Sequence, residues 1–67
     1  MIDITLNGAP HQVPLGQTLD QLIAALSLEN QALALAVNRN VVPRKAWHDR
    51  VLEIQDQVEI VRAIGGG

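Results

Sequence analysis

The residues of this chain that could do chemistry lie at its end, and that chemistry belongs to the backbone. The last four residues, Ile64-Gly65-Gly66-Gly67, place three glycines before a terminal carboxylate. Glycine has no Cβ atom, so such a tail can pass through a channel too narrow for side chains. Three extended residues reach about 10 Å. We therefore consider a reactive C-terminus that enters a partner's pocket, and as the alternative a frayed end of the kind common at termini.

The rest of the chain offers little for catalysis or for metal binding. Cysteine is absent, which excludes disulfides and thiolate metal sites. His11 and His48 each stand without a nearby second ligand, so we predict no metal site. The sequence has no convincing acid/base pair and no phosphate-binding loop before a helix. The side chains therefore give no indication of catalysis by this chain itself.

Composition limits the class of protein further. The chain has 67 residues and a formal net charge of −2, with a pI near 5.4. Nucleic-acid binding would need a basic stripe and usually stacking aromatics, so we expect no nucleic-acid partner. No apolar run approaches the roughly 20 residues that span a bilayer, and Met1-Ile2-Asp3 begins a strand, not a signal peptide. We expect a soluble cytoplasmic protein, monomeric when free.

The first elements are predicted to be a hairpin. Apolar and polar residues alternate from Ile2 to Leu6, as in a half-buried strand. Asn7-Gly8 favours a type I′ turn. The return strand runs from about Ala9 to Val13, and Pro10 confines it to a sheet edge.

A helix is predicted next. Thr18 can cap its first turn and Gln21 can reach back in a capping box. One apolar stripe of an amphipathic helix of about three turns follows, formed by Leu19, Leu22, Ile23 and Leu26. The polar residues from Ser27 to Gln31 end this helix and leave its apolar stripe to pack on the sheet.

The segment from Ala32 to Val37 is apolar on both of its alternating faces. A strand covered on one side by the helix would bury the large residues, which are Leu33, Leu35 and Val37. It would leave outside a smooth face of small residues, Ala32, Ala34 and Ala36. Such a face lets another protein approach closely, although a neighbouring loop could also cover it.

The remaining segments complete a sheet. Asn38-Arg39-Asn40 indicates a turn, and Val41-Val42-Pro43 a brief strand. In the short helical turn predicted from Arg44 to Asp49, Trp47 packs against the sheet edge. After a turn at Gln55-Asp56, the last strand runs from Gln57 to Ala63 and buries Val58 and Ile60.

This order of elements predicts an α+β fold. It is a ββαββ mixed sheet crossed by one helix, with the first and last strands parallel at the centre. That is the β-grasp, or ubiquitin-like, architecture. We expect residues 1–63 to form the domain and residues 64–67 a flexible glycine tail.

The chain also resembles a known family over essentially its whole length. The segments that carry the resemblance are Asn7-Gly8, Gly16-Gln17-Thr18, Leu35-Ala36-Val37-Asn38, Val42-Pro43-Arg44 with Trp47, and Asp56 with Val58-Glu59-Ile60-Val61 before the glycines. They are similar to ThiS, the sulfur carrier protein family of thiamine biosynthesis. One departure is Gln55, where the family commonly has glycine.

The resemblance implies a protein substrate. An E1-like enzyme would adenylate Gly67 with its own ATP and magnesium, and a sulfur donor, commonly a cysteine persulfide protein, would convert it to a thiocarboxylate. Thiazole synthase would accept the sulfur. The alternatives are a carrier of the molybdopterin synthase small-subunit type, a ubiquitin-like modifier of lysines and an inert β-grasp binding module.

A partner needs more than the tail to bind. Ordering three glycines costs about 3–6 kcal/mol of backbone entropy. Offsetting that takes on the order of 120–240 Å² of apolar contact at about 25 cal/mol per Å². We therefore predict that Ala34 and Ala36 form a docking surface together with Val61 and Ile64, and that Arg62 lies at its rim. Gly65 and Gly66 would give passage and reach.

Overall fold

The computed structural model describes residues 1–62 and builds them into one mixed sheet with one α-helix. The elements in chain order are β1 Ile2–Leu6, β2 Ala9–Val13, α1 Leu19–Ala25, β3 Leu33–Val37, β4 Asn40–Val42, the 3₁₀ helix η1 Arg44–Ala46, and β5 Gln57–Arg62. Ala63 and the predicted tail of residues 64–67 lie outside the described residues.

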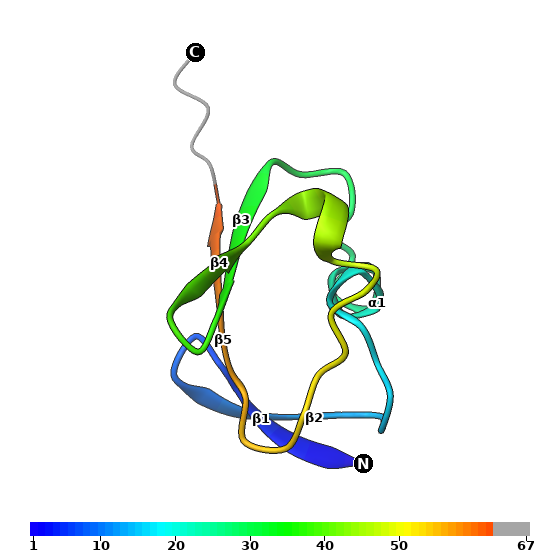
Figure 1. The fold of residues 1–67 in the computed structure, drawn as a ribbon, viewed down its shortest axis with the longest axis vertical. Helices are drawn as coiled ribbons and strands as arrows, with labels where there is room; N and C mark the ends of the chain where they lie inside the picture. Colours follow the sequence, from blue (N-terminus) through cyan, green and yellow to red (C-terminus); the bar gives the residue numbers. More distant parts are fainter. Residues whose placement is uncertain (63–67) are drawn as a thin grey trace.

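The five strands are ordered β2-β1-β5-β3-β4. β5 lies at the centre, parallel to β1 and antiparallel to β3. Figure 1 shows that β1 and β2 cross one end of the molecule while β3, β4 and β5 run toward the other, so the sheet is strongly twisted. The predicted β-grasp architecture with its central parallel pair is confirmed, and the brief strand after the Asn38 turn is β4.

The first hairpin forms as predicted. Asn7 and Gly8 have φ angles of 50° and 82°, as a type I′ turn requires. Asn7 also reaches beyond its hairpin, because its side-chain Oδ1 accepts a hydrogen bond from the backbone N–H of Ile60 at 2.8 Å. The turn residue thus extends the contact between β1 and β5 by one position.

The helix begins and ends where predicted, before the polar residues that start at Ser27, but it is shorter than predicted. Gln21 Oε1 accepts a hydrogen bond from the Thr18 N–H at 3.0 Å, which is the predicted return contact of the capping box. The expected three turns are wrong, since α1 has seven residues, about two turns. Ser27 adopts φ 60°, and the Leu28 N–H donates to the Ile23 carbonyl at 3.0 Å, which closes the helix in a Schellman motif.

An aliphatic core lies between the helix and the sheet. Its buried members are Ile4, Val13, Leu19, Leu22, Ile23, Leu35, Val37, Trp47, Leu52 and Val58. Trp47 packs at the β4 edge as predicted, and its Nε1 donates to the Val42 carbonyl at 2.9 Å. Among residues 1–62, no helix has the length and apolar character to cross a membrane.

Candidate functional site

The predicted reactive segment continues directly from β5, so the site is described by what holds this strand at each end. Ile64, Gly65, Gly66 and Gly67 lie outside the described residues, and their roles stay predictions. The two ends of β5 are Gln57, next to the turn that enters the strand, and Arg62, from which the chain runs on toward the glycines.

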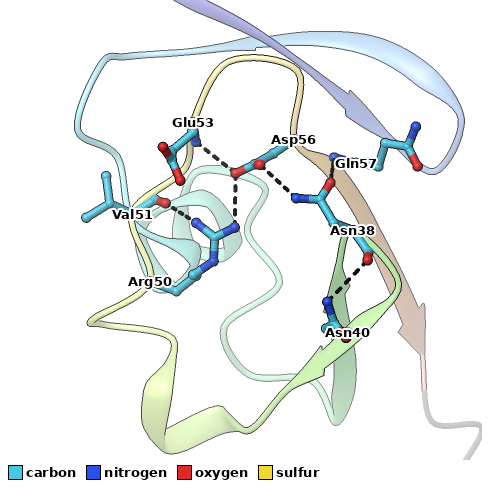
Figure 2. Close-up of polar contacts among 7 residues, drawn as sticks. All are labelled: Asn38, Asn40, Arg50, Val51, Glu53, Asp56 and Gln57. Carbon is cyan, nitrogen blue, oxygen red and sulfur yellow. Dashed lines mark hydrogen bonds and ion pairs between the residues drawn. The ribbon is translucent and has the colours of Figure 1, made fainter.

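A buried carboxylate anchors the start of β5. Asp56 is 5% exposed, and it is the only buried polar residue in the part of the chain that the structure describes. Figure 2 shows that its two oxygens are shared among three donors. Oδ1 accepts from Asn38 Nδ2 at 3.0 Å, while Oδ2 accepts from the Glu53 N–H at 2.8 Å and from Arg50 Nη2 at 3.3 Å. Such full satisfaction is what a buried charge requires.

Asn38 connects this carboxylate to both strands of the β3–β5 pair. Its Oδ1 accepts from the Gln57 N–H at 2.9 Å (Figure 2), and its own N–H donates to the Gln57 carbonyl at 2.8 Å. Its φ of 51° belongs to the left-handed region that asparagine tolerates. Sequence reasoning gave Asn38 and Asp56 no structural role beyond their turns. The available signal was an acidic residue placed directly before an apolar strand.

Gln55 takes a backbone conformation that favours glycine. Its φ is 66°, and its N–H donates to the Asp3 carbonyl at 2.7 Å. The tight turn therefore forms with glutamine in the left-handed region, at a steric cost of about 1–2 kcal/mol. This geometry explains why glycine suits the position.

Three of the predicted docking residues meet on the sheet face that points away from α1. Ala34 pairs with Val61 across β3 and β5, and Ala36 pairs with Val41 across β3 and β4. Ala34 is exposed and Ala36 is half-buried, while Val61 and Val41 are 62% and 77% exposed. We call these four residues the outer aliphatic patch. Val41 was missed, although its alternation with Val42 in the sequence could have indicated its face.

Arg62 lies elsewhere, which corrects its predicted place at the rim of this patch. Successive strand residues point to opposite faces, and Arg62 lines a hollow on the helix side with Leu33 and Ile60. Val61 and Arg62 therefore offer contacts on two different faces of β5.

In the described part of the chain, metal-ligating side chains do not gather near the end of β5. Within residues 1–62, no group of three His, Asp or Glu side chains could hold a metal ion. The only ion pairs among those residues are His48 with Asp49 and Arg50 with Asp56. What the described part supplies is a strand with a fixed base and two apolar surfaces beside its far end.

Comparisons with known proteins agree on one family. The ThiS family model matches residues 4–67. The chain is 32% identical to the sulfur carrier protein ThiS of Escherichia coli over 98% of its own length and 100% of that protein. The crystal structure of the thiamine biosynthesis protein ThiS from Geobacter metallireducens superimposes with a TM-score of 0.84 at 28% identity, covering 98% of this chain and 100% of that one.

A longer relative matches as well. The chain is 41% identical to a thiazole synthase of Magnetococcus marinus over 96% of its own length. It spans only 20% of that protein, whose remaining length has no counterpart here.

Proposed function

The chain belongs to the ThiS family of sulfur carrier proteins in thiamine biosynthesis. From that premise we propose that Gly67 is the residue that carries the sulfur. The observation that supports this most is that the family match runs through residue 67 and so includes the three glycines. The backbone carboxylate of Gly67 would carry the sulfur as a thiocarboxylate.

The chemistry proposed for Gly67 needs activation first. An α-carboxyl group has a pKa of about 3.3–3.7, so at neutral pH it is an anion that resists nucleophilic attack. Its oxygen attacks the α-phosphorus of ATP and pyrophosphate leaves, which produces an acyl adenylate. The terminal sulfur of the cysteine persulfide then adds to the carbonyl carbon, and AMP departs with the electron pair of the C–O bond, which leaves an acyl disulfide. A thiol then attacks the donor cysteine sulfur and breaks the S–S bond, so the thiocarboxylate stays on Gly67 and the donor leaves as a disulfide with that thiol. ATP, magnesium and the sulfur donor belong to partner proteins in this scheme.

Docking of the adenylating enzyme is assigned to the outer aliphatic patch. Small side chains at Ala34 and Ala36 permit a close approach, and Val61 lies directly before the end of β5. An enzyme that binds this face holds the strand from which the tail departs. Contact here supplies the binding energy that ordering of the tail consumes.

Thiazole synthase is the proposed sulfur acceptor. Support comes from the Magnetococcus relative, whose name is thiazole synthase and which contains a segment similar to this chain on the same polypeptide. Carrier and acceptor chemistry thus belong together in that protein. The rival molybdopterin acceptor and the lysine modifier have no such support.

Intact mass tests the proposal. The chain is incubated with the cognate adenylating enzyme, ATP, magnesium, a cysteine persulfide donor and a thiol reductant. We expect exchange of one oxygen for one sulfur at Gly67, located by fragmentation, and no exchange in a variant that lacks Gly67. An unchanged mass with enzymes proven active on another carrier would contradict the proposal, and isopeptide adducts on lysines would assign the chain to the modifiers.

A further inference from the structure

The core of the domain is open to solvent beside the end of β5, on the helix side of the sheet. Five partly buried aliphatic side chains converge there around a hollow of about 370 Å³. They are Leu6, Leu26, Leu28, Leu33 and Ile60. The hollow exists because α1 ends at Ala25 and leaves Leu26 and Leu28 in the loop that follows, only partly covered.

Next to this hollow, the edge of β5 that points toward β1 has backbone groups without a partner among residues 1–62. Asn38 bonds to the Gln57 carbonyl, so the odd-numbered residues of β5 direct their polar groups toward β3. The Asn7 N–H donates to the Val58 carbonyl at 2.9 Å, so the even-numbered residues face β1. The pairing of β1 with β5 stops at Leu6 and Val58. Beyond the contact from Asn7 to Ile60, the Ile60 carbonyl and the Arg62 N–H have no partner among residues 1–62.

A cation borders this open edge. Arg62 is exposed and has no ion-pair partner in the described range 1–62. By contrast, Arg50 pairs with Asp56, and Arg44 donates to the Glu29 carbonyl while lying 4.9 Å from the centre of the Trp47 ring. An acidic group of a partner would find Arg62 available at the rim of the hollow.

We propose that this edge and hollow bind an extended segment of thiazole synthase, which lies beside β5 beyond the end of β1. The backbone of that segment pairs with the Ile60 carbonyl and the Arg62 N–H, as in strand addition. One of its apolar side chains fills the hollow, and a carboxylate on the same face of the segment pairs with Arg62. This inference rests on the proposed function for its choice of partner.

The arrangement serves transfer because an added strand has a direction. A segment bound beside Ile60 and Arg62 would run along the end of β5, next to the point where the described residues end. The outer aliphatic patch lies on the opposite face of the sheet and stays available. Loading and delivery of sulfur would then use two different faces of one strand.

Affinity measurements with charge-matched variants test the inference. The chain is titrated with the cognate thiazole synthase by calorimetry, as wild type and as Arg62→Glu, Leu28→Ser and Lys45→Glu. Lys45 is an exposed cation in η1, so its variant makes the same change in net charge away from the hollow. We expect Arg62→Glu and Leu28→Ser to weaken binding about tenfold or more, and Lys45→Glu to change it less than about twofold. Exchange of the Arg62 amide should slow about tenfold when the synthase binds.

The same variants are passed through the loading assay, which separates this inference from the proposed function. Failure of the wild-type chain to load sulfur defeats the proposed function. Variants that load and also bind the synthase as the wild type does overturn the strand-addition site. Variants that lose loading but keep synthase binding overturn it too, because the hollow would then serve the adenylating enzyme. If the NMR signals of Leu28 in the free chain shift with protein concentration, the hollow binds a second copy of the chain.

Discussion

The two ends of β5 are built in opposite ways. At its start, Gln57 is bonded through both backbone groups to Asn38, and the neighbouring Asp56 accepts three hydrogen bonds. At its end, Arg62 lies opposite Leu33 of β3, and within residues 1–62 no strand pairs with it on its other side. One strand is thus locked where it enters the sheet and accessible where it leaves.

This difference fits a sulfur carrier protein, the family to which the chain belongs. Groups that would satisfy a buried charge are concentrated at the base, far along β5 from its exit. The exit presents apolar surface and backbone groups that are unpaired among residues 1–62, which a partner can use without unfolding the domain. Stability and delivery are therefore predicted to respond to different mutations.

The largest expected effect lies beyond the exit of β5. Gly66→Val should lower the rate of sulfur loading about a hundredfold or more, because a side chain there blocks passage and displaces the reacting carboxylate. Mass spectrometry of a loading time course measures this rate. The melting temperature should stay within error of the wild type, and a parallel loss of stability would show that the glycines support the domain.

The base of the strand should respond to Asp56→Ala with a loss of stability. Removing the carboxylate leaves the Asn38 amide, the Glu53 N–H and Arg50 without their acceptor, and we expect a loss of about 2–4 kcal/mol in urea unfolding. Asp3→Ala is the matched control, because that exposed carboxylate accepts only from Gln12 Nε2 at 2.9 Å. Its cost should stay below about 0.5 kcal/mol, and equal costs for both variants would refute the anchoring role.

The outer aliphatic patch should respond to Ala34→Asp with a loss of binding. A charge opposite Val61 adds a desolvation cost to the interface, so the affinity for the adenylating enzyme should fall about tenfold while unfolding changes by less than about 1 kcal/mol. Ala9→Asp places the same change on an exposed alanine of the edge strand β2 and should bind normally. Normal adenylation of Ala34→Asp would remove the patch from the docking surface.

The smallest expected effect is a gain in stability. Gln55→Gly relieves the left-handed strain at φ 66° and should raise the free energy of unfolding by about 0.5–1 kcal/mol, after the added backbone entropy of glycine is subtracted. Thermal unfolding should show a rise of about 2–8 °C. A loss of stability would mean that the Gln55 side chain makes a contact worth more than the strain.

Local sequence signals predicted most of the fold. Asn7-Gly8, the Thr18–Gln21 cap and the alternation in β3 act over a few residues, and each was confirmed. The end of α1 next to Ser27 was predicted from the polar residues that follow, and only the length of about three turns was overestimated.

The contacts that fix the site act over longer distances. Asn38 and Asp56 are 18 residues apart, so their hydrogen bond becomes visible only when β3 and β5 are placed side by side. The face of Arg62 followed from strand alternation with Val61, and grouping the two by their proximity in sequence gave the wrong surface. The predicted roles of Gly65 and Gly66 in passage and of Gly67 as the reacting residue come from the sequence alone and await the loading experiment.

Amide hydrogen exchange resolved along β5 tests the contrast between its two ends most directly. In the free chain, the Gln57 and Asn38 amides should exchange only through global unfolding, while the Arg62 amide exchanges several orders of magnitude faster by local opening. Adding about 1 M urea should accelerate Gln57 and leave Arg62 nearly unchanged. Gln57 and Arg62 amides that exchange at the same rate would contradict the account of a locked base and an open exit.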